Sequence, residues 1–410
     1  MTGSQPVLLL LSARRRVIVK ARELGLDAVH IEAPTMSEPE LRELCRYSTL
    51  ADLLDVTGVV RLARSLYERF GFAGVTSNHE PACVAAEAIA LDLGLRAPGS
   101  GPAVLLRDKI AMRTRLAGHD QLGSAWAEIS GPDDIRAAAQ VVGYPMIVKP
   151  SRGSASLGVV RVDGPGDLDA AADRVRGMLR NEHRYHELLP VTRFLAEPFV
   201  EGTEYSVESF SRNGCHEAQA VVRKITEASF VEVGHITPAP LDSATVAAVV
   251  SRVFTFLDVV GLKEGPAHTE VIVGRSGVHI VESHTRTGGD EIFELVQLVS
   301  GRDPELEMLA HFAGLDIPGR RAPVAAAVAK IYLVAPSAGR IRDVEGIEDA
   351  LAVPGVRSVA LSVSPGDRVG PVTASWDRLG AIVATGDTPE GAWQTALRAR
   401  NLVKVHLEEA

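Results

Sequence analysis

The stretch that decides the fold reads AHTEVIVGRSGVHIVESHTRTGGD and spans residues 267–290. Within it, two runs rich in β-branched residues flank the sequence GRSG at 274–277, a pattern that predicts a β-hairpin. Glu270 and Glu282 stand at mirror positions about Ser276. In a hairpin symmetric about that residue, the two carboxylates face each other across the strands, with Cβ atoms about 4.5–5.5 Å apart.

The two glutamates are bordered by apolar residues, so we expect the pair to be at least half-buried. Like charges at this spacing repel each other, and a divalent cation between them removes the repulsion. Carboxylate oxygens suit Mg²⁺ or Mn²⁺. In the alternative, the strands slip by one residue and one glutamate faces solvent.

The residues that follow the hairpin favour the metal interpretation. Glu282, His284 and Arg286 alternate along an extended segment, so their side chains point the same way. Gly288 and Gly289 then allow the backbone to approach a ligand closely. A cation with a guanidinium beside it is what a phosphoryl group in transfer requires, so we expect phosphate chemistry here.

The composition is that of an ordinary globular protein. The 410 residues suffice for two or three domains, and 46% of them are hydrophobic and 23% charged. The net charge of −9 and the aromatic share of 5% argue against nucleic acid as the main partner. An acidic protein can still bind ATP through local positive charge.

Cysteine usage and the first apolar run bear on location. Cys45, Cys83 and Cys215 are far apart and form no CxxC pair, so we expect a reducing cytoplasm and no thiolate zinc site. The apolar run at 7–11 is too short for a membrane span and lacks the preceding basic residues of a signal peptide. We therefore expect no membrane partner.

Residues 1–103 alternate short apolar strands with amphipathic helices, which predicts a small parallel α/β layer. The first expected elements are strands at 7–11 and 28–31 and helices near 17–25 and 38–46. The loop at 12–16 reads SARRR and lacks the GxGxxG of a dinucleotide site. Its arginines either start a solvated helix, the interpretation we favour, or meet an anionic substrate.

A loop rich in glycine and serine, SRGSASLG at 151–158, joins an expected strand at 146–150 to a returning strand at 159–162. Its small residues expose backbone N–H groups to anionic oxygens and Lys149 adds a point charge, which is typical of a phosphate-covering flap. It is not a Walker A loop, because GK[ST] is missing. A plain hairpin loop is the alternative, and Lys109 upstream is by itself an ordinary surface charge.

The segment at 194–208 offers the polar groups of an adenine site. Pro198 keeps its carbonyl and Val200 offers an N–H, which match the donor and acceptor of an adenine ring. Glu204 is then close enough to accept from ribose hydroxyls. The alternative is an edge strand and turn with solvated glutamates.

Residues 223–240 show no regular period, so we expect a loop that lines a cleft. Arg223, Glu232 and His235 are candidates for contacting substrate, although each of them alone is more often structural.

The last part of the chain begins after a Pro/Gly-rich boundary at 318–323. Strand-like runs at 325–334, 359–363 and 381–384 precede a helix that Thr388 caps. No cluster of ligand residues is evident there, so we expect an α+β domain that serves packing or forms a homodimer.

Lys109, the flap, the adenine segment and the Glu282–Arg286 group occur in this order over about 180 residues. The order resembles that of the ATP-grasp superfamily, over roughly residues 5–318. The resemblance implies a parallel α/β domain at 1–103 and an ATP-grasp domain at 104–318, with ATP between two α+β subdomains. It implies phosphate contacts from Lys109, Lys149, Ser154, Ala155 and Ser156, adenine contacts from Glu197, Pro198 and Val200, a ribose contact from Glu204, and Mg²⁺ ligands in Glu270 and Glu282.

Residues 319–410 resemble the closing α+β domain of the L-amino-acid ligases, which join two amino acids into a dipeptide, and GHITPA at 234–239 fits that group. There Arg286, with Gly288 and Gly289, would hold the substrate carboxylate or the acyl phosphate. His284 departs from the pattern, because the family commonly carries an asparagine there as a ligand of a second Mg²⁺. An imidazole suits Mn²⁺, Zn²⁺ or a hydrogen bond better.

The resemblance implies an ATP-dependent carboxylate–amine ligase in which Lys149 and Arg286 are catalytic. A small carboxylate, expected to be an amino acid, becomes an acyl phosphate, and an amine displaces the phosphate, so that ADP and phosphate are released. Two alternatives stay open: a carboxylating or purine-pathway enzyme that uses bicarbonate or formate, and a nucleotide-binding protein without ligase activity. A substrate carried on a carrier protein is also compatible with the sequence.

Overall fold

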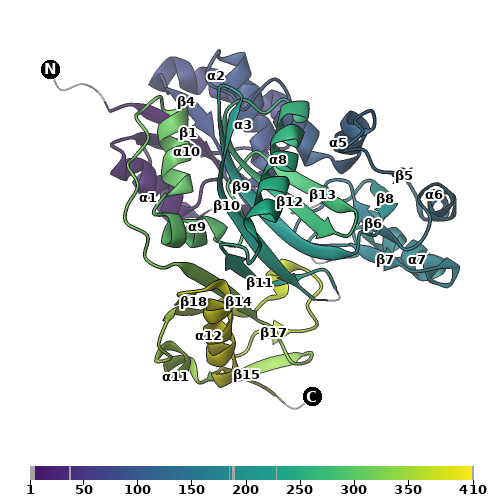
Figure 1. The fold of residues 1–410 in the computed structure, drawn as a ribbon. Coiled ribbons are helices and arrows are strands. Elements are labelled where there is room, and N and C mark those ends of the chain that lie inside the picture. The colour runs from purple at the N-terminus through teal and green to yellow at the C-terminus, as the bar shows by residue number, and fades with distance from the viewer. Residues whose placement is uncertain (1–4, 37, 184, 187–189, 228, 409–410) are drawn as a thin grey trace.

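The computed structural model describes residues 5–36, 38–183, 185–186, 190–227 and 229–408, and it begins with a parallel α/β layer (Figure 1). Four parallel strands lie in the order β3-β2-β1-β4. The elements are β1 (Val7–Leu11), α1 (Arg15–Glu23), β2 (Asp27–Glu32), β3 (Tyr47–Leu50), α2 (Val56–Phe70), β4 (Gly74–Thr76) and α3 (Glu80–Asp92). The predicted parallel layer is confirmed.

The helix expected near 38–46 is present, but it is shorter and of another type. Those residues form a short 3-10 helix, η2 (Pro39–Leu44), because Cys45 is already extended and the chain enters β3 at Tyr47. The layer is completed by a helix from much later in the chain, α10 (Pro304–Phe312), whose Met308 and Phe312 pack against the sheet.

A smaller antiparallel sheet carries the glycine- and serine-rich loop. Its strands lie in the order β5-β8-β6-β7, and helices α6 and α7 pack on it. The elements are β5 (Ala127–Ile129), α6 (Ile135–Val142), β6 (Met146–Pro150), β7 (Val160–Val162), α7 (Leu168–Leu179) and β8 (Phe194–Pro198). The strand–loop–strand unit predicted at 146–162 is present.

The largest sheet has eight strands in the order β13-β12-β9-β10-β11-β14-β18-β16. Their bounds are β9 (Gly202–Arg212), β10 (Cys215–Thr226), β11 (Glu232–Thr237), β12 (Gly265–Gly274), β13 (Gly277–His284), β14 (Ala327–Leu333), β16 (Val356–Leu361) and β18 (Gly380–Gly386). The sheet therefore continues across residue 319 into the last part of the chain, and the division at that residue stays a prediction.

The loop expected at 223–240 is largely strand. β10 and β11 pair antiparallel, with Lys224 opposite His235 and a register shift at Ile225. Charged residues such as Lys224 and Glu232 interrupt the apolar alternation because they face a polar site, and this concealed the strands in the sequence.

The hairpin of β12 and β13 pairs Glu270 with Glu282, as predicted. The symmetry assumed for it is wrong near the turn, where Gly274 pairs with Gly277. A bulge between Glu270 and Val271 leaves Val281 as the extra residue and brings the two glutamates into register.

Helix α8 (Ser243–Val260) packs on the large sheet (Figure 1). By length and composition alone it is long and apolar enough to cross a membrane. Its Val253, Phe256 and Leu257 belong to the core that includes β12 and β13, while Asp258 and Ser251 are exposed. One face of the helix is therefore packed in the core.

The last part of the chain adds a small sheet and two helices to strands β14, β16 and β18 (Figure 1). The sheet has the order β17-β15-β19, with β15 (Gly339–Glu345), β17 (Arg368–Val369) and β19 (Lys404–Leu407), and the helices are α11 (Ile347–Leu351) and α12 (Pro389–Leu402). Thr388 caps α12 as expected, since its side chain accepts from the Gly391 N–H at 3.0 Å. The small sheet was not predicted because its strands are short and interrupted by charged residues.

Candidate functional site

A cavity of about 1550 Å³ is lined by residues of the N-terminal layer, both other sheets and the last part of the chain. The residues predicted from the sequence that lie on its wall are Lys109, Lys149, Ser154, Ala155, Ser156, Glu197, Pro198, Val200, Glu204, Glu232, Glu270, Glu282, Arg286, Gly288 and Gly289. Three described candidates, Arg223, His235 and His284, are not part of the wall.

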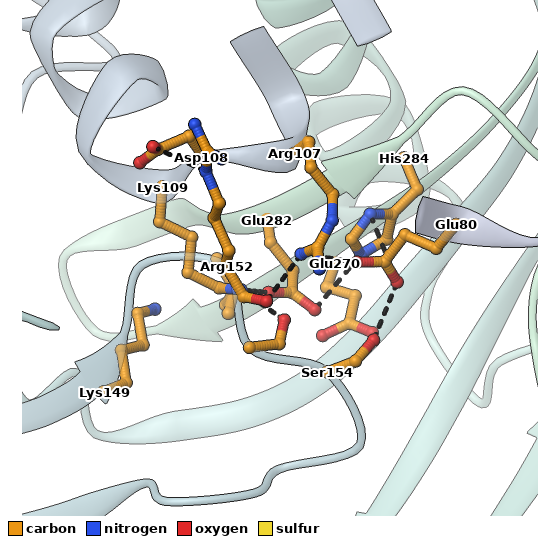
Figure 2. Close-up of polar contacts among 12 residues, drawn as sticks. Glu80, Arg107, Asp108, Lys109, Lys149, Arg152, Ser154, Glu270, Glu282 and His284 are labelled. Atoms are coloured by element: carbon orange, nitrogen blue, oxygen red, sulfur yellow. Dashed lines mark hydrogen bonds and ion pairs between the residues drawn. The ribbon is translucent and has the colours of Figure 1, made fainter. Parts of the chain in front are cut away.

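The opposed glutamates are each held by a lysine. Glu282 Oε2 lies 2.5 Å from Lys109 Nζ, and Glu270 Oε1 lies 2.6 Å from Lys224 Nζ; Figure 2 shows Lys109 pointing toward Glu282. Burial alone would raise the pKa of both carboxyls, but the two ammonium groups hold both pKa values low, that of Glu270 at about 2. Both glutamates are therefore ionised at neutral pH.

Lys224 binds three carboxylates at once. Its Nζ lies 2.9 Å from Glu204 and 2.6 Å from Glu270, and it forms a short ion pair with Glu232. Burial would lower its pKa, but the three carboxylates raise that pKa well above its usual value. One ammonium cannot neutralise three carboxylates, so burial, with Asp290 and Glu270 nearby, raises the pKa of Glu232 to about 8.

Lys149 lies on β6, directly before the flap, and pairs with Glu197 on β8. Arg113 of α5 (Lys109–Leu116) donates to the same carboxylate from its Nε at 2.9 Å. Burial raises the pKa of Glu197, but Arg113 and Lys149 lower it to about 2. Glu197 thus holds two cationic side chains, those of Arg113 and Lys149, beside the cavity.

The flap is tied over the cavity at two points. Ser154 Oγ donates to Glu80 Oε2 at 2.8 Å, and Ser156 Oγ donates to the Phe230 carbonyl at 2.8 Å. Ala155 and Ser156 both have left-handed backbones, with φ of 57° and 59°. Such conformations cost energy in residues other than glycine, so the surrounding contacts fix the shape of the loop.

One hydrogen bond bears on the backbone of the edge predicted to bind adenine. Phe199 donates its N–H to the Pro145 carbonyl at 2.9 Å, away from the cavity site. Backbone groups alternate along an extended chain, so those of Pro198 and Val200 point the other way. All three residues line the cavity.

Glu80, the first residue of α3, joins the N-terminal layer to the glutamate site (Figure 2). Its Oε2 lies 3.1 Å from Arg286 Nη2 and 3.7 Å from His284 Nδ1, and its Oε1 lies 3.1 Å from Arg107 Nη1. Burial would raise its pKa, but these three cationic or titratable partners hold it well below its usual range. His284 also lies 3.3 Å from Glu282, so it bridges the two carboxylates.

Two family models match the chain. The model described as an ATP-grasp domain matches residues 142–294, the region of the flap, the adenine edge and the opposed glutamates. The chain has an ATP-grasp domain. The model described as L-amino acid ligase C-terminal domain 2 matches residues 331–408, the last part of the chain.

The ATP-grasp fold of this chain is shared with solved structures over its whole length. The L-amino acid ligase from Bacillus licheniformis covers 100% of both chains, with a TM-score of 0.84 and 20% identity. Phosphoribosylglycinamide synthetase from Anaerococcus prevotii covers 99% of this chain and 100% of its own, with a TM-score of 0.73 and 16% identity. At these identities the similarity establishes the fold alone.

Among curated proteins, the alanine–anticapsin ligase of Bacillus subtilis (strain 168) is 25% identical over 276 residues, 63% of this chain and 58% of that protein. The aligned region covers 56–58% of the length of the three alanine–anticapsin ligases it matches. These relatives are longer than this chain, and the match covers only part of each.

The residues of this ATP-grasp domain fit a divalent cation. Glu270 and Glu282 present two ionised carboxylates across neighbouring strands, with Lys109 and Lys224 beside them. Carboxylate oxygens are the ligands that Mg²⁺ and Mn²⁺ prefer. His284 adds a nitrogen donor and already bonds Glu282, so it fits better as a partner of that carboxylate than as an Mg²⁺ ligand.

Several residues of the site were missed in the sequence. Glu80 lies 190 positions before Glu270, and an acidic residue in the first turn of a helix carries no specific signal. Lys224 lies within 223–240, where the sequence predicts a loop. The one sequence signal for its burial is its position near the apolar residues Val221, Val222 and Ile225.

A second group missed in the sequence lies where the last part of the chain meets the cavity. Arg378 donates to both oxygens of Asp290 at 2.7 and 2.6 Å and lies over the Tyr332 ring at 3.7 Å. His235 is buried and its Nε2 lies 3.2 Å from Asp290, which lines the cavity. Against burial, His235 and Arg378 hold the pKa of Asp290 well below its usual value.

Proposed function

We propose that this chain is an ATP-dependent carboxylate–amine ligase that joins an amino acid to an amine through an acyl phosphate and releases ADP and phosphate. Two findings support the class of reaction: the ATP-grasp domain, and the match of residues 331–408 to a domain named for L-amino acid ligases. The names of the relatives point the same way, since alanine–anticapsin ligase and L-amino acid ligase are both ligases of amino acids.

The observation that carries the proposal is the opposed Glu270–Glu282 pair with Lys109, Lys224 and Arg286 around it. Two fixed carboxylates suit a cation bound to phosphate, and the surrounding ammonium and guanidinium groups suit phosphate and carboxylate oxygens. Mg²⁺, or Mn²⁺, held by the two glutamates would offset the charge of the nucleotide.

In the proposed nucleotide site, Pro198 and Val200 meet adenine and Glu204 meets ribose. Lys109 and Lys149 meet the phosphates, and the loop of Ser154, Ala155 and Ser156 covers them. Glu197 positions Lys149 and contacts the adenine amino group. Lys224 forms ion pairs with both Glu204 and Glu270, so we assign it a phosphate contact as well.

In the proposed reaction, a carboxylate oxygen attacks the γ-phosphorus of ATP, and the bond to the β–γ bridging oxygen breaks to release ADP. Lys149 and Arg286 stabilise the oxyanions as charge shifts. The amine nitrogen then forms a bond to the acyl carbon, phosphate leaves with the electrons of the C–O bond, and the nitrogen loses a proton to solvent. The flap keeps water from the acyl phosphate.

The two alternative functions have less support. Phosphoribosylglycinamide synthetase shares the fold at 16% identity, which does not transfer a substrate to this chain. The closing segment instead matches the L-amino acid ligase domain, so we favour amino acids over bicarbonate or formate. A silent nucleotide-binding protein would not require Arg286 and both glutamates beside the flap.

We further propose the division of the chain at about residues 103 and 318, a cytoplasmic location and free small-molecule substrates. The thiols of Cys45, Cys83 and Cys215 are unpaired, in keeping with a reducing compartment. A homodimer and a carrier-bound substrate are compatible with the fold, and size-exclusion chromatography with light scattering distinguishes monomer from dimer.

Product analysis tests the proposal. The purified chain is incubated with ATP, Mg²⁺ and pairs of amino acids, and nucleotides, phosphate and dipeptides are quantified. We expect ADP, phosphate and amide in equal amounts. Formation of AMP and pyrophosphate would refute the mechanism, and turnover that requires bicarbonate would favour the carboxylating alternative.

A further inference from the structure

The cavity continues past the glutamate pair to the carboxyl edge of the parallel sheet, where ligands of such sheets commonly bind. We call this extension the N-terminal arm. Its wall contains residues that follow each of the four strands: Arg14 and Arg16, Pro34, Leu53 and Leu54, and Asn78 and His79. None of the roles assigned above uses the arm.

Arg14 differs from the other guanidiniums near this arm in being unpaired. Arg16 Nε lies 3.1 Å from Glu305, and Arg107 and Arg286 share Glu80. The Arg14 side chain is exposed and has no hydrogen-bond or ion-pair partner in the part of the chain that the structure describes. It therefore presents an uncompensated positive charge to the cavity.

Arg14 also lies within electrostatic range of the reaction site. Burial, opposed by Glu80 and assisted by the charges of Arg286, Arg14 and Arg107, lowers the pKa of His79 to about 4. Arg14 and Arg286 thus act on the same imidazole. His79 precedes Glu80, and the Glu80 carboxylate holds Arg286. The arm therefore borders Arg286, beside which the acyl phosphate would form.

We propose that the N-terminal arm binds the amine substrate as an α-amino acid and that Arg14 receives its carboxylate. The inference rests on the ligase function proposed above. The amine must reach the acyl carbon from a side that the nucleotide does not fill, and the residues assigned to adenine lie on another sheet than those of the arm. A guanidinium pairs with a carboxylate through two parallel hydrogen bonds. Pro34, Leu53 and Leu54 give the arm an apolar wall that suits a hydrocarbon side chain.

The test compares three nucleophiles with one acid substrate: the best-used amino acid of an apolar panel, its carboxamide and hydroxylamine. Arg14→Gln is compared with Arg15→Gln, a matched control, since Arg15 is exposed and not on the cavity wall. We expect Arg14→Gln to raise KM for the amino acid by about 10- to 100-fold, the usual loss for a charged hydrogen bond, with kcat nearly unchanged. KM for the carboxamide should not rise. Arg14→Lys should restore part of the affinity, because it keeps the charge and loses the planar fork.

Every other outcome counts against the inference. An equal rise in KM for amino acid and carboxamide, or no rise, would overturn the role of Arg14. If hydroxamate and ADP form but no amino acid serves as the nucleophile, the amino acid assignment fails and the ligase function stands. If the wild-type chain forms neither hydroxamate nor ADP with any acid, the ligase function itself fails, and this inference fails with it.

Discussion

Replacing Lys224 by methionine removes the ammonium group shared by Glu204, Glu232 and Glu270, and keeps an unbranched side chain. The ligand atoms of these three carboxylates lie within 4.8 Å of one another. Two unit charges at about 4 Å repel by about 4 kcal/mol at an effective dielectric constant of 20. The variant therefore takes up protons rather than bear this repulsion, and its stability depends on pH.

The size of the effect follows from the cost of protonation. Glu232, with its pKa raised to about 8, already carries a proton through most of the neutral range, so the loss falls on Glu204 and Glu270. Protonating one carboxyl of ordinary pKa costs about 1.4 kcal/mol per pH unit above that pKa, which gives about 4 kcal/mol at pH 7.5 and about 1.4 kcal/mol at pH 5.5. In the wild-type chain, the pKa of Lys224 is raised, so its contribution is complete at both pH values and is lost only above its usual pKa of about 10.5.

Urea unfolding followed by fluorescence measures the difference, in a chelating buffer that excludes divalent cations. Lys263→Met is the matched control, because Lys263 is exposed. We expect Lys224→Met to lose about 3–5 kcal/mol at pH 7.5, the usual cost of breaking a buried ion pair, and clearly less at pH 5.5. An equal loss at both pH values, or no loss at pH 7.5, would refute the electrostatic account of this cluster.

Four further substitutions test other parts of the account. Glu282→Gln should reduce metal-dependent turnover at least about 100-fold with an unchanged circular dichroism spectrum, because a cation ligand is lost. Arg286→Ala should lower kcat for acid-dependent ADP release by about 100-fold while ATP affinity, measured by calorimetry, is retained. His284→Asn should raise activity with Mg²⁺ relative to Mn²⁺, because it places an oxygen donor where the imidazole serves only as a partner of Glu282; an unchanged ratio of the two activities would contradict this. Burial raises the pKa of Glu87 to about 7. The favourable contribution of Glu87 to the free energy of unfolding is therefore present below the ordinary pKa of a glutamate and is lost as the pH rises through 7. Glu87→Gln should raise the urea midpoint at pH 8 and not at pH 5.

The sequence predicted those parts of the site that depend on local pattern. The pairing of Glu270 with Glu282 was visible from their positions in a hairpin, although the assumed symmetry overlooked a bulge. The flap and the adenine edge were visible because small residues at 151–158 and Pro198 leave few alternatives for the backbone. Each of these signals lies within one supersecondary unit.

The parts that were missed depend on contacts between distant segments. Glu80 reaches Arg286 only because the N-terminal layer docks on the large sheet, and no local pattern encodes that distance. Arg378 meets Asp290 because β14 and β18 extend the large sheet beyond residue 319. Lys224 was hidden for another reason: a strand with charged residues on the face toward a site loses the alternation by which strands are found.

The central claim is that an acyl phosphate forms between ATP and the acid substrate. An acid labelled with ¹⁸O in its carboxylate tests this most directly, with the released phosphate analysed by mass spectrometry after complete turnover. Because the acid oxygen bonded to phosphorus leaves with the phosphate, the account predicts one ¹⁸O in each phosphate released and none in the nucleotide. Unlabelled phosphate, or label in AMP, would contradict it.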